Sequence, residues 1–481
     1  DNNNWGLIIY GANNMAAGAS TLALGNENEA RGDATTAIGV GSKALDKQSV
    51  ALGNVARATK QGSVAIGSYV NAETTNSGTA TAPVYNSKDV GQYSTAVGSQ
   101  SWTKGDYSAA YGYQAEATGT NAVAIGRVSK ATGTSATAVG VNNKAQAQDS
   151  SAVGSSNTIA AGATQASAFG RENTVNRGGT IAAGYKNTAD GDRNVTIGNE
   201  NTTTGEETIG IGTKVIAGTG KTIAIGSVYN PGGGVEKQTI ARGDDTINPA
   251  TGQVNNIFAL AIGNGAQADG KDNKASGMIA IGQDVLANNN NTIAMGVQAK
   301  ATGNQAIAFG KIANASGSGA FALGQATNAT SHGSIAMGNG AQSNGSGSTA
   351  LGRTAQATKD GTVALGFNAE ATGDHAIAIG GDGKGAAFDN TNTTFAGLGE
   401  KTTASAKNAV AVGHQATANI EGGVALGSES KTTINAGVQG YNPASDRTNK
   451  YSTQAGAVGT STLAAVSIGE DSTKTRQLTG L

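Results

Sequence analysis

The chain has 481 residues, a formal net charge of −1 and no cysteine. Glycine supplies 74 residues and aromatic residues only 4%, so bulky side chains are too scarce to fill the wide core of an ordinary domain. The balanced charge lacks the basic footprint of a nucleic-acid-binding protein, and the absence of cysteine excludes disulfides and thiolate metal sites. We therefore expect a repetitive structure made of thin layers.

A short apolar run that ends in glycine recurs along the chain. We call each such residue an anchor glycine. There are 29 of them, and 21 of the 28 intervals between them are 14 residues long. The anchors are Gly11, 25, 39, 53, 67, 98, 112, 126, 140, 154, 170, 184, 198, 212, 226, 263, 282, 296, 310, 324, 338, 352, 366, 380, 399, 413, 427, 459 and 469. This period predicts an all-β solenoid with 14-residue coils.

Two segments of each coil have strand character. We number positions from the preceding anchor glycine. Positions +3 to +5 hold small residues around a polar +4, as in Ala369-Glu370-Ala371, which predicts a strand with one buried and one wet face. Positions +10 to +13, as in Ala376-Ile377-Ala378-Ile379, are apolar on both faces and predict a strand covered on both sides. Glycine is frequent at +7, as at Gly373, where we expect a turn with positive φ.

The +10 to +13 strand has a small face at +10 and +12 and a large face at +11 and +13. A coil of 14 residues encloses only one of them, so the other would form a long apolar stripe that a monomer does not tolerate. We therefore expect a cyclic homo-oligomer that covers the stripe. We prefer the large side chains inside the roll and the small face, including Ala308, against the partners. The opposite placement stays open.

The first long departure from the spacing, at about 68–93, precedes the unusual coil SWTKGDYSAAYGY (101–113). Trp102 occupies +4, where other coils carry charge, Tyr107 and Tyr113 fall at turns, and we expect Tyr111 at +13 to be buried. An exposed Trp flanked by Tyr has the composition of a binding hot spot. The alternative, which we prefer, is that the preceding insertion covers Trp102.

Four asparagines stand at +3 in successive coils, each followed by threonine. They are Asn157, Asn173, Asn187 and Asn201. Stacked identical amides can form a hydrogen-bonded ladder, so we assign these residues a structural role. The threonine row alone would suggest ice binding, but four coils make too short a face.

Three more large breaks in the spacing follow, near 227–257, 381–394 and 428–454. Together the four insertions hold all four prolines and six of the eleven tyrosines. Recognition concentrates in long loops on rigid scaffolds, although such loops also serve as decoration or as clasps within an oligomer. The candidate ligand-contact residues are Trp102, Tyr107, Tyr113, Tyr69, Tyr85, Tyr229, Tyr441 and Tyr451.

Catalytic and metal-binding patterns are weak. His332, His375 and His414 are about three coils apart and cannot share a metal within one chain, and no Ser/His/Asp grouping has a credible spacing. We expect no enzyme, cofactor or metal site. The tripeptide Arg31-Gly32-Asp33 is explained by the repeat, whereas Arg242-Gly243-Asp244 lies in an insertion; neither is a strong integrin signal.

The repeats GSVAIGS (62–68), NAVAIG (121–126) and HAIAIG (375–380) resemble the head repeats of YadA-like trimeric autotransporter adhesins of Gram-negative bacteria. The resemblance covers essentially the whole chain. It implies a left-handed parallel β-roll over 1–469 that assembles as a homotrimer. The segment VSIGEDSTKTRQLTGL (466–481) resembles the start of the neck, so we expect residues 470–481 to lead towards a stalk outside this chain.

The same resemblance implies an extracellular adhesin head on the bacterial cell surface, held at the outer membrane only through a C-terminal anchor outside this chain. Its expected partners are a host matrix protein (collagen, fibronectin or laminin) or a host receptor such as one of the CEACAM family, and not nucleic acid. The alternative is a rigid spacer or self-associating rod that drives autoaggregation or biofilm formation. A polysaccharide-cleaving solenoid is disfavoured because no carboxylate cluster recurs.

Overall fold

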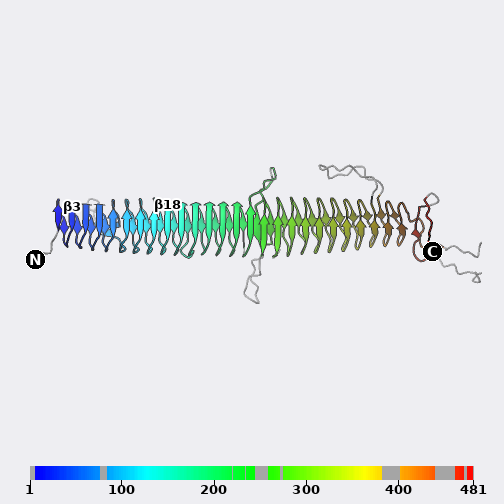
Figure 1. Cartoon of the computed structure of the whole chain (residues 1–481), viewed down its shortest axis with the longest axis horizontal. Helices are drawn as coiled ribbons and strands as arrows, with labels where there is room; N and C mark the ends of the chain where they lie inside the picture. Colours follow the sequence, from blue (N-terminus) through cyan, green and yellow to red (C-terminus); the bar gives the residue numbers. More distant parts are fainter. Residues whose placement is uncertain are drawn as a thin grey trace, which may run out of the picture. The chain divides into compact units, whose positions relative to one another are not determined.

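In a computed structural model the chain divides into two compact units, Asp1–Ser227 and Val228–Leu481. The structure describes residues 6–75, 84–218, 220–232, 234–243, 258–270, 275–381, 401–438, 461–470 and 474–479. Each unit is a parallel β-solenoid, and its described residues contain no helix (Figure 1). The predicted all-β solenoid is therefore confirmed.

Each regular coil contributes one strand to a wide sheet and a two-residue strand to a narrow sheet. In the wide sheet β38 (Ile307–Phe309) pairs in parallel with β40 (Phe321–Leu323), so that Ala308 lies beside Ala322. In the narrow sheet β37 (Lys300–Ala301) pairs with β39 (Asn314–Ala315) in the same way. Equivalent positions of successive coils therefore stack in register, as the 14-residue period predicts.

The strands of the first unit follow this alternation, with one inserted hairpin. Its wide-sheet strands are β1 (Ile8–Tyr10), β3 (Leu22–Asn26), β5 (Thr36–Val40), β7 (Val50–Asn54), β9 (Val64–Ile66), β12 (Thr95–Val97), β14 (Ala109–Tyr111), β16 (Val123–Ile125), β18 (Thr137–Val141), β20 (Ser151–Ser155), β22 (Ser167–Arg171), β24 (Ile181–Tyr185), β26 (Val195–Asn199), β28 (Ile209–Thr213) and β30 (Ile223–Gly226). Its narrow-sheet strands are β2 (Met15–Ala16), β4 (Glu29–Ala30), β6 (Lys43–Ala44) and β8 (Arg57–Ala58), followed after the hairpin by β13 (Trp102–Thr103), β15 (Glu116–Ala117), β17 (Lys130–Ala131), β19 (Lys144–Ala145), β21 (Thr158–Ile159), β23 (Thr174–Val175), β25 (Thr188–Ala189), β27 (Thr202–Thr203) and β29 (Ile216–Ala217). The hairpin consists of β10 (Ala72–Thr75) and β11 (Val84–Ser87).

The second unit repeats the same two kinds of strand. Its wide-sheet strands are β32 (Ala259–Ile262), β34 (Met278–Ile281), β36 (Ile293–Met295), β38, β40, β42 (Ile335–Met337), β44 (Thr349–Leu351), β46 (Val363–Leu365), β48 (Ile377–Ile379), β50 (Val410–Val412), β52 (Val424–Leu426) and β53 (Val466–Ser467). Its narrow-sheet strands are β31 (Ile240–Arg242), β33 (Gln267–Asp269), β35 (Leu286–Ala287), β37, β39, β41 (Asn328–Ala329), β43 (Gln342–Ser343), β45 (Gln356–Ala357), β47 (Glu370–Ala371), β49 (Thr403–Ala404) and β51 (Thr417–Ala418).

The small face of the wide sheet lines the roll, and the large face points outward. Ala306 and Ala308 at +10 and +12 are fully buried, as is Ala301 on the facing narrow strand. Ile307 is half-buried, and Phe309 at +13 is 48% exposed. Our preferred placement of the large side chains inside the roll is therefore wrong. Tyr111, which we expected to be buried at +13, is 42% exposed for the same reason.

The physical reason is the short distance between the two sheets. At Gly210, which replaces the usual alanine at +12, an added Cβ would lie 2.8 Å from the Cγ2 atom of Thr203 on the narrow sheet. One coil earlier, Thr196 and Thr203 share a hydrogen bond of 2.7 Å across the interior. At +12 the space between the sheets thus takes a methyl-sized group or a hydroxyl pair, and Ile or Phe there would overpack it, although the facing +5 position holds the larger Ile159 and Val175 in two coils.

Glycines serve two different purposes in the coil, and neither matches the turn that we predicted at +7. Gly303 at +7 has no positive φ; an added Cβ would lie 1.9 Å from the carbonyl oxygen of Gly317 in the next coil. Left-handed φ values recur instead at the anchor glycine and at +2 and +9. At +9 the residue is often not glycine, as at Gln305 with a φ of 58°.

Two predicted anchor glycines fall between strands that are direct neighbours in the wide sheet. Strand β48 pairs directly with β50, and β52 pairs directly with β53. Gly399 and Gly459 lie between these pairs and outside the described residues. The insertion predicted at 227–257 also contains a rung of the narrow sheet, because β31 pairs with β33 within the second unit.

The asparagine ladder is present and begins one coil earlier than we predicted, at Asn143. The side-chain amide of Asn157 donates to the Oδ1 atom of Asn143 at 3.0 Å, and Asn173 donates to Asn157 at 3.0 Å. Each amide also donates to backbone carbonyls, as Asn173 does to Phe169 and Gly184. All of these side chains are fully buried, which confirms their structural role.

We predict that the anchor glycines tolerate no side chain. Gly366 has a φ of +124°, and an added Cβ would lie 1.8 Å from the carbonyl oxygen of Gly380, so Gly366→Ala should cost at least about 3 kcal/mol of stability. The matched control is Gly347→Ala at +9, where φ is +64° and no atom lies within 4 Å. Its cost should be only about 1–2 kcal/mol. Urea unfolding midpoints of both variants measure the difference, and equal midpoints would contradict the close stacking of anchors.

Candidate functional site

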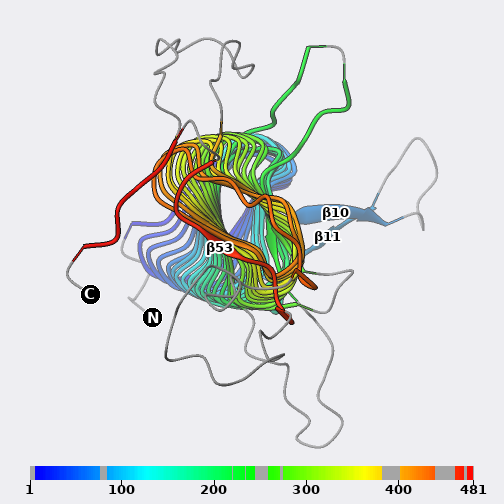
Figure 2. The same cartoon turned by 90° about the vertical axis from the view of Figure 1, so that its right-hand side faces the viewer.

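A hairpin interrupts the narrow sheet of the first unit. Strands β10 and β11 pair antiparallel and project from the roll (Figure 2). The chain leaves the roll at Asn71, which is almost fully buried: its amide nitrogen donates to the carbonyl of Arg57 at 3.0 Å, and its Oδ1 atom accepts from the Thr103 N–H at 2.8 Å. These contacts hold the base of the hairpin beside strand β13.

Trp102 lies at the base of this hairpin. Its indole Nε1 donates to the carbonyl oxygen of Asp89 at 2.8 Å, and the ammonium of Lys88 lies 4.5 Å from the ring centroid. Both partners follow β11, so the insertion contacts the ring, as our preferred interpretation expected. The side chain remains half-buried rather than enclosed.

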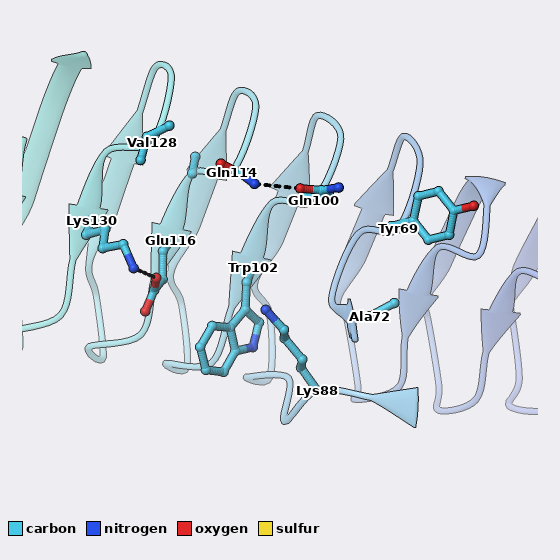
Figure 3. Close-up of a pocket in the computed structure, with 10 residues that line it drawn as sticks. Tyr69, Ala72, Lys88, Gln100, Trp102, Gln114, Glu116, Val128 and Lys130 are labelled. Carbon is cyan, nitrogen blue, oxygen red and sulfur yellow. Dashed lines mark hydrogen bonds and ion pairs between the residues drawn. The ribbon is translucent and has the colours of Figure 1, made fainter. Parts of the chain in front are cut away.

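A groove of about 570 Å³ runs across the coils beside Trp102 (Figure 3). One wall is formed by the residues at +2 of successive coils, which we call the +2 column. The other is formed by the residues at +4 in the narrow sheet, the +4 column, together with Ala72 and Lys88 at the base of the hairpin. The +2 wall consists of Tyr69, Gln100, Gln114 and Val128, and the +4 wall of Trp102, Glu116 and Lys130. Every residue of the +2 wall has a φ between 54° and 59°, so the backbone at this turn adopts the strained left-handed conformation that recurs in the repeat.

Polar contacts between neighbouring coils order the groove. Gln114 Nε2 donates to Gln100 Oε1 at 2.7 Å, and the Lys130 ammonium lies 2.6 Å from a Glu116 carboxylate oxygen. The carboxylate of Asp89 lies 3.7 Å from the Lys104 ammonium. No carboxylate of a described side chain pairs with Lys88. The groove therefore combines an aromatic ring, a pair of amides and an ammonium.

Of the eight candidate residues, the structure brings Tyr69 and Trp102 together in this groove. Tyr107 stacks on Tyr93 with centroids 5.5 Å apart in the +9 column, and it is 62% exposed. Tyr113 is 46% exposed at +1. Neither Tyr107 nor Tyr113 lines the groove.

Of the other four candidates, only Tyr229 has a described side chain. Tyr229 belongs to the second unit, where it forms an antiparallel bridge with Lys237. Tyr85 belongs to β11, and its side chain, like Tyr441 and Tyr451, lies outside the described residues. Sequence reasoning missed Lys88, Gln100, Gln114 and Lys130. Gln100 and Gln114 share the +2 position and Lys130 occupies +4 of a regular coil, so the repeat could have identified these three residues. Lys88 lies in the insertion, where the repeat gives no such signal.

Comparison with known families explains the repeat. The sequence model of the YadA head domain repeat, in two copies, matches twelve segments that together cover half of the chain. The matches are 16–42, 30–56, 47–69, 90–115, 107–129, 131–157, 287–311, 315–341, 329–355, 343–369, 357–382 and 404–430. The chain belongs to this family of adhesin heads. No protein in the comparison with curated proteins matches it.

The segment that we assign to the start of the neck folds back on the last coil of this YadA-like head. Lys474 pairs with Glu429 at 2.6 Å and with Glu470 at 3.3 Å, and Arg476 donates to the Ser430 hydroxyl at 2.9 Å. The hydrogen bond from Lys474 lowers the pKa of Glu429, and the hydrogen bond from Lys431 lowers the pKa of Glu470. Water reaches all of these groups and therefore screens the ion pairs.

The two Arg-Gly-Asp tripeptides are engaged in contacts within the head. Asp33 accepts a hydrogen bond from the Ala19 N–H at 3.0 Å. Arg242 forms two hydrogen bonds to the carboxylate of Asp269, at 2.7 and 2.6 Å. Asp244 lies outside the described residues. In the first tripeptide both charged side chains, Arg31 and Asp33, stay exposed.

Within the described ranges, no group of three or more His, Asp or Glu side chains is arranged to hold a metal ion. The part of the chain that the structure describes also has no helix long and apolar enough to cross a membrane.

We predict that the C-terminal segment detaches at acidic pH. The pKa values of Glu429 and Glu470 are lowered in the folded state, so the ion pairs stabilise the segment above the ordinary carboxyl pKa and are lost as the pH falls through the lowered values. Hydrogen exchange of the Glu470 amide, which donates to the Lys474 carbonyl at 3.0 Å, should after correction for intrinsic rates show protection at pH 7 and loss at about pH 3.

The matched internal control is strand β46, whose amides should stay protected over the same range because alanine packing holds the coil. The variant Lys474→Gln should expose the segment at pH 7. Equal protection of the Glu470 amide at both pH values would contradict a role for these ion pairs.

Proposed function

We propose that the chain is the head of a bacterial surface adhesin that assembles as a homotrimer and binds a host extracellular matrix or cell-surface receptor protein. Membership of the YadA head family supports the adhesin class and implies a trimer at the cell surface. The observation that carries the proposal is the outward apolar face of the wide sheet, which the described residues leave partly exposed.

This face is a stripe of stacked large residues at +11 and +13. Phe309 and Leu426 are each 48% exposed, Phe169 44% and Ile125 40%. Because equivalent positions stack in register, these exposed side chains form a row along each unit rather than scattered points. Such a row exceeds the apolar patches that monomers expose, so two further copies of the chain are its proposed cover.

The stripe and the groove lie on opposite outer faces of the roll. Side chains alternate along a strand, so +11 and +13 point outward from the wide sheet and +4 points outward from the narrow sheet. Trimer contacts through the wide sheet therefore leave Trp102 and its groove towards the solvent. The groove is our proposed contact for a host protein, among which collagen, fibronectin, laminin and CEACAM-type receptors are the first to test.

On this proposal residues 1–469 are the β-roll head and 470–481 begin the neck. The head then lies outside the cell, tethered to the outer membrane by a segment beyond this chain. Binding and assembly require no catalysis, cofactor or metal.

We predict that carboxylates on the stripe prevent assembly without unfolding the roll. Glutamate at Met295, Phe309 and Leu323, the +13 residues of three successive coils, should shift the protein from trimer to monomer in analytical ultracentrifugation. Burying each unpaired carboxylate costs several kcal/mol. Glutamate at Lys300, Asn314 and Asn328, the outward +4 residues that come next in the chain after these three +13 positions, is the matched control and should leave the trimer intact.

Ala308→Glu should behave differently, because its carboxylate would lie inside the roll and unfold the coil. A trimer that persists with glutamate at all three +13 positions would show that another surface holds the copies together.

We predict that Trp102 contributes to host-protein binding. In surface plasmon resonance with immobilised collagen, fibronectin, laminin and a CEACAM ectodomain, Trp102→Ala should weaken binding to one of them by at least about tenfold, or about 1.4 kcal/mol. Tyr185→Ala removes another surface aromatic, which contacts Arg171 and does not line the groove, and should leave binding unchanged.

The spacer and self-association function makes the opposite prediction. If none of these proteins binds and beads coated with the trimer clump with one another, the head is a rigid self-associating rod, and the receptor proposal fails.

A further inference from the structure

We propose that the groove of the first unit binds a sugar that bears a carboxylate, with Trp102, Lys88 and Gln100 as its principal contacts. The proposal rests on the proposed adhesin function and names the ligand chemistry of its site. The volume of the groove, about 570 Å³, lies within the range of small-molecule sites.

Trp102 provides a platform whose orientation is fixed. The hydrogen bond from its Nε1 atom to the Asp89 carbonyl holds the indole edge against the base of the hairpin. The face of an aromatic ring carries negative partial charge, and the C–H groups on one side of a sugar ring carry positive partial charge, so the two surfaces stack favourably. A ring that is already oriented loses little entropy when the ligand binds.

Lys88 selects for an anion. Its ammonium lies over the Trp102 ring, and no carboxylate of a described side chain pairs with it, whereas the neighbouring Lys104 and Lys130 have Asp89 and Glu116 as partners. A carboxylate on a sugar stacked at Trp102 would accept charge-assisted hydrogen bonds from this ammonium. A neutral sugar would gain only the stacking contact.

The two glutamines supply partners for hydroxyl groups. Their mutual hydrogen bond uses Gln114 Nε2 and Gln100 Oε1, which leaves the Gln100 amide nitrogen as a donor and the Gln114 oxygen as an acceptor. Figure 3 shows the Gln100 nitrogen on the side of the amide that faces Tyr69 along the +2 wall. A sugar hydroxyl is both donor and acceptor, so it fits this pair better than an apolar peptide side chain does.

The test is a fluorescence titration of the full chain. The sequence has two tryptophans, Trp5 and Trp102, so a Trp5→Phe background makes the emission report on the groove alone. The probes are 3′-sialyllactose and a hyaluronan tetrasaccharide, which carry different carboxylated sugars, with lactose as the neutral comparator. At least one acidic probe should bind saturably and at least about tenfold more tightly than lactose.

Charge variants assign the contact. Lys88→Gln should weaken binding of the acidic probe by about tenfold or more, and Lys88→Arg should retain it within about threefold, because both cations donate to a carboxylate. Lys300→Gln removes an outward charge at +4 of a regular coil, which does not line the groove, and should change nothing. All variants should keep the thermal midpoint of the parent, which shows that the roll is intact.

Two results would overturn the sugar proposal. One is that acidic probes bind no more tightly than lactose or that Lys88→Gln binds like the parent. The other is that a host protein stripped of its glycans still binds, and that Trp102→Ala abolishes this binding, which would assign the groove to polypeptide. If host proteins bind while the sugars fail, the adhesin function stands without this ligand. If the sugars bind while host proteins fail, the groove stands and the protein-receptor proposal falls.

Discussion

The short distance between the two sheets of each coil determines where almost every other residue of this head can go. Fourteen residues close a roll whose interior admits the methyl groups of Ala301, Ala306 and Ala308, all fully buried. A pair of threonine hydroxyls at 196 and 203 fills the same space only by hydrogen bonding across it. The larger apolar side chains of the wide sheet therefore point outward, although they are hydrophobic, and the interior takes larger residues at narrow-sheet positions such as Ile159 and Val175.

That constraint connects the core to assembly. A roll filled with alanine buries little apolar area per residue, and the hydrophobic effect scales with that area. Isoleucine, leucine and phenylalanine residues that could contribute more are on the outside of the wide sheet, where the described residues leave them partly exposed. The stability of the head and its oligomeric state are therefore linked. Within one chain, backbone hydrogen-bond ladders and buried amides such as Asn173 stabilise each coil.

The groove arises where the regular array is interrupted. The hairpin leaves the roll at Asn71, which separates the narrow-sheet strands β8 and β13 and opens space beside the first rung after the break. Trp102 occupies that rung, and residues after β11 return across it, so the insertion both creates the groove and orients the ring. The +2 turns, already held in left-handed geometry by the repeat, supply the facing wall.

Particular residues show how far pattern reasoning reaches. The period placed Asn157, Asn173, Asn187 and Asn201 in one ladder, and the structure confirms it. The same period could not say that Lys88 lies over Trp102, because a contact made by an insertion depends on where its ends leave and rejoin the roll. Tyr107 and Trp102 are five residues apart in the sequence, yet they belong to different columns, so their proximity along the chain did not predict a shared site.

The sequence by itself determined the coil length, the stacking register, the buried amide ladder and the family, since each of these repeats many times and a local rule suffices to read it. Only the tertiary structure decided which apolar face of the wide sheet is interior, because alternation identifies two faces without saying how thick the enclosed space is. It also decided the role of the +7 glycines, where a neighbouring coil's carbonyl, and not the local turn, excludes a side chain. Contacts between coils and insertions are long-range, and no short stretch of sequence contains both partners.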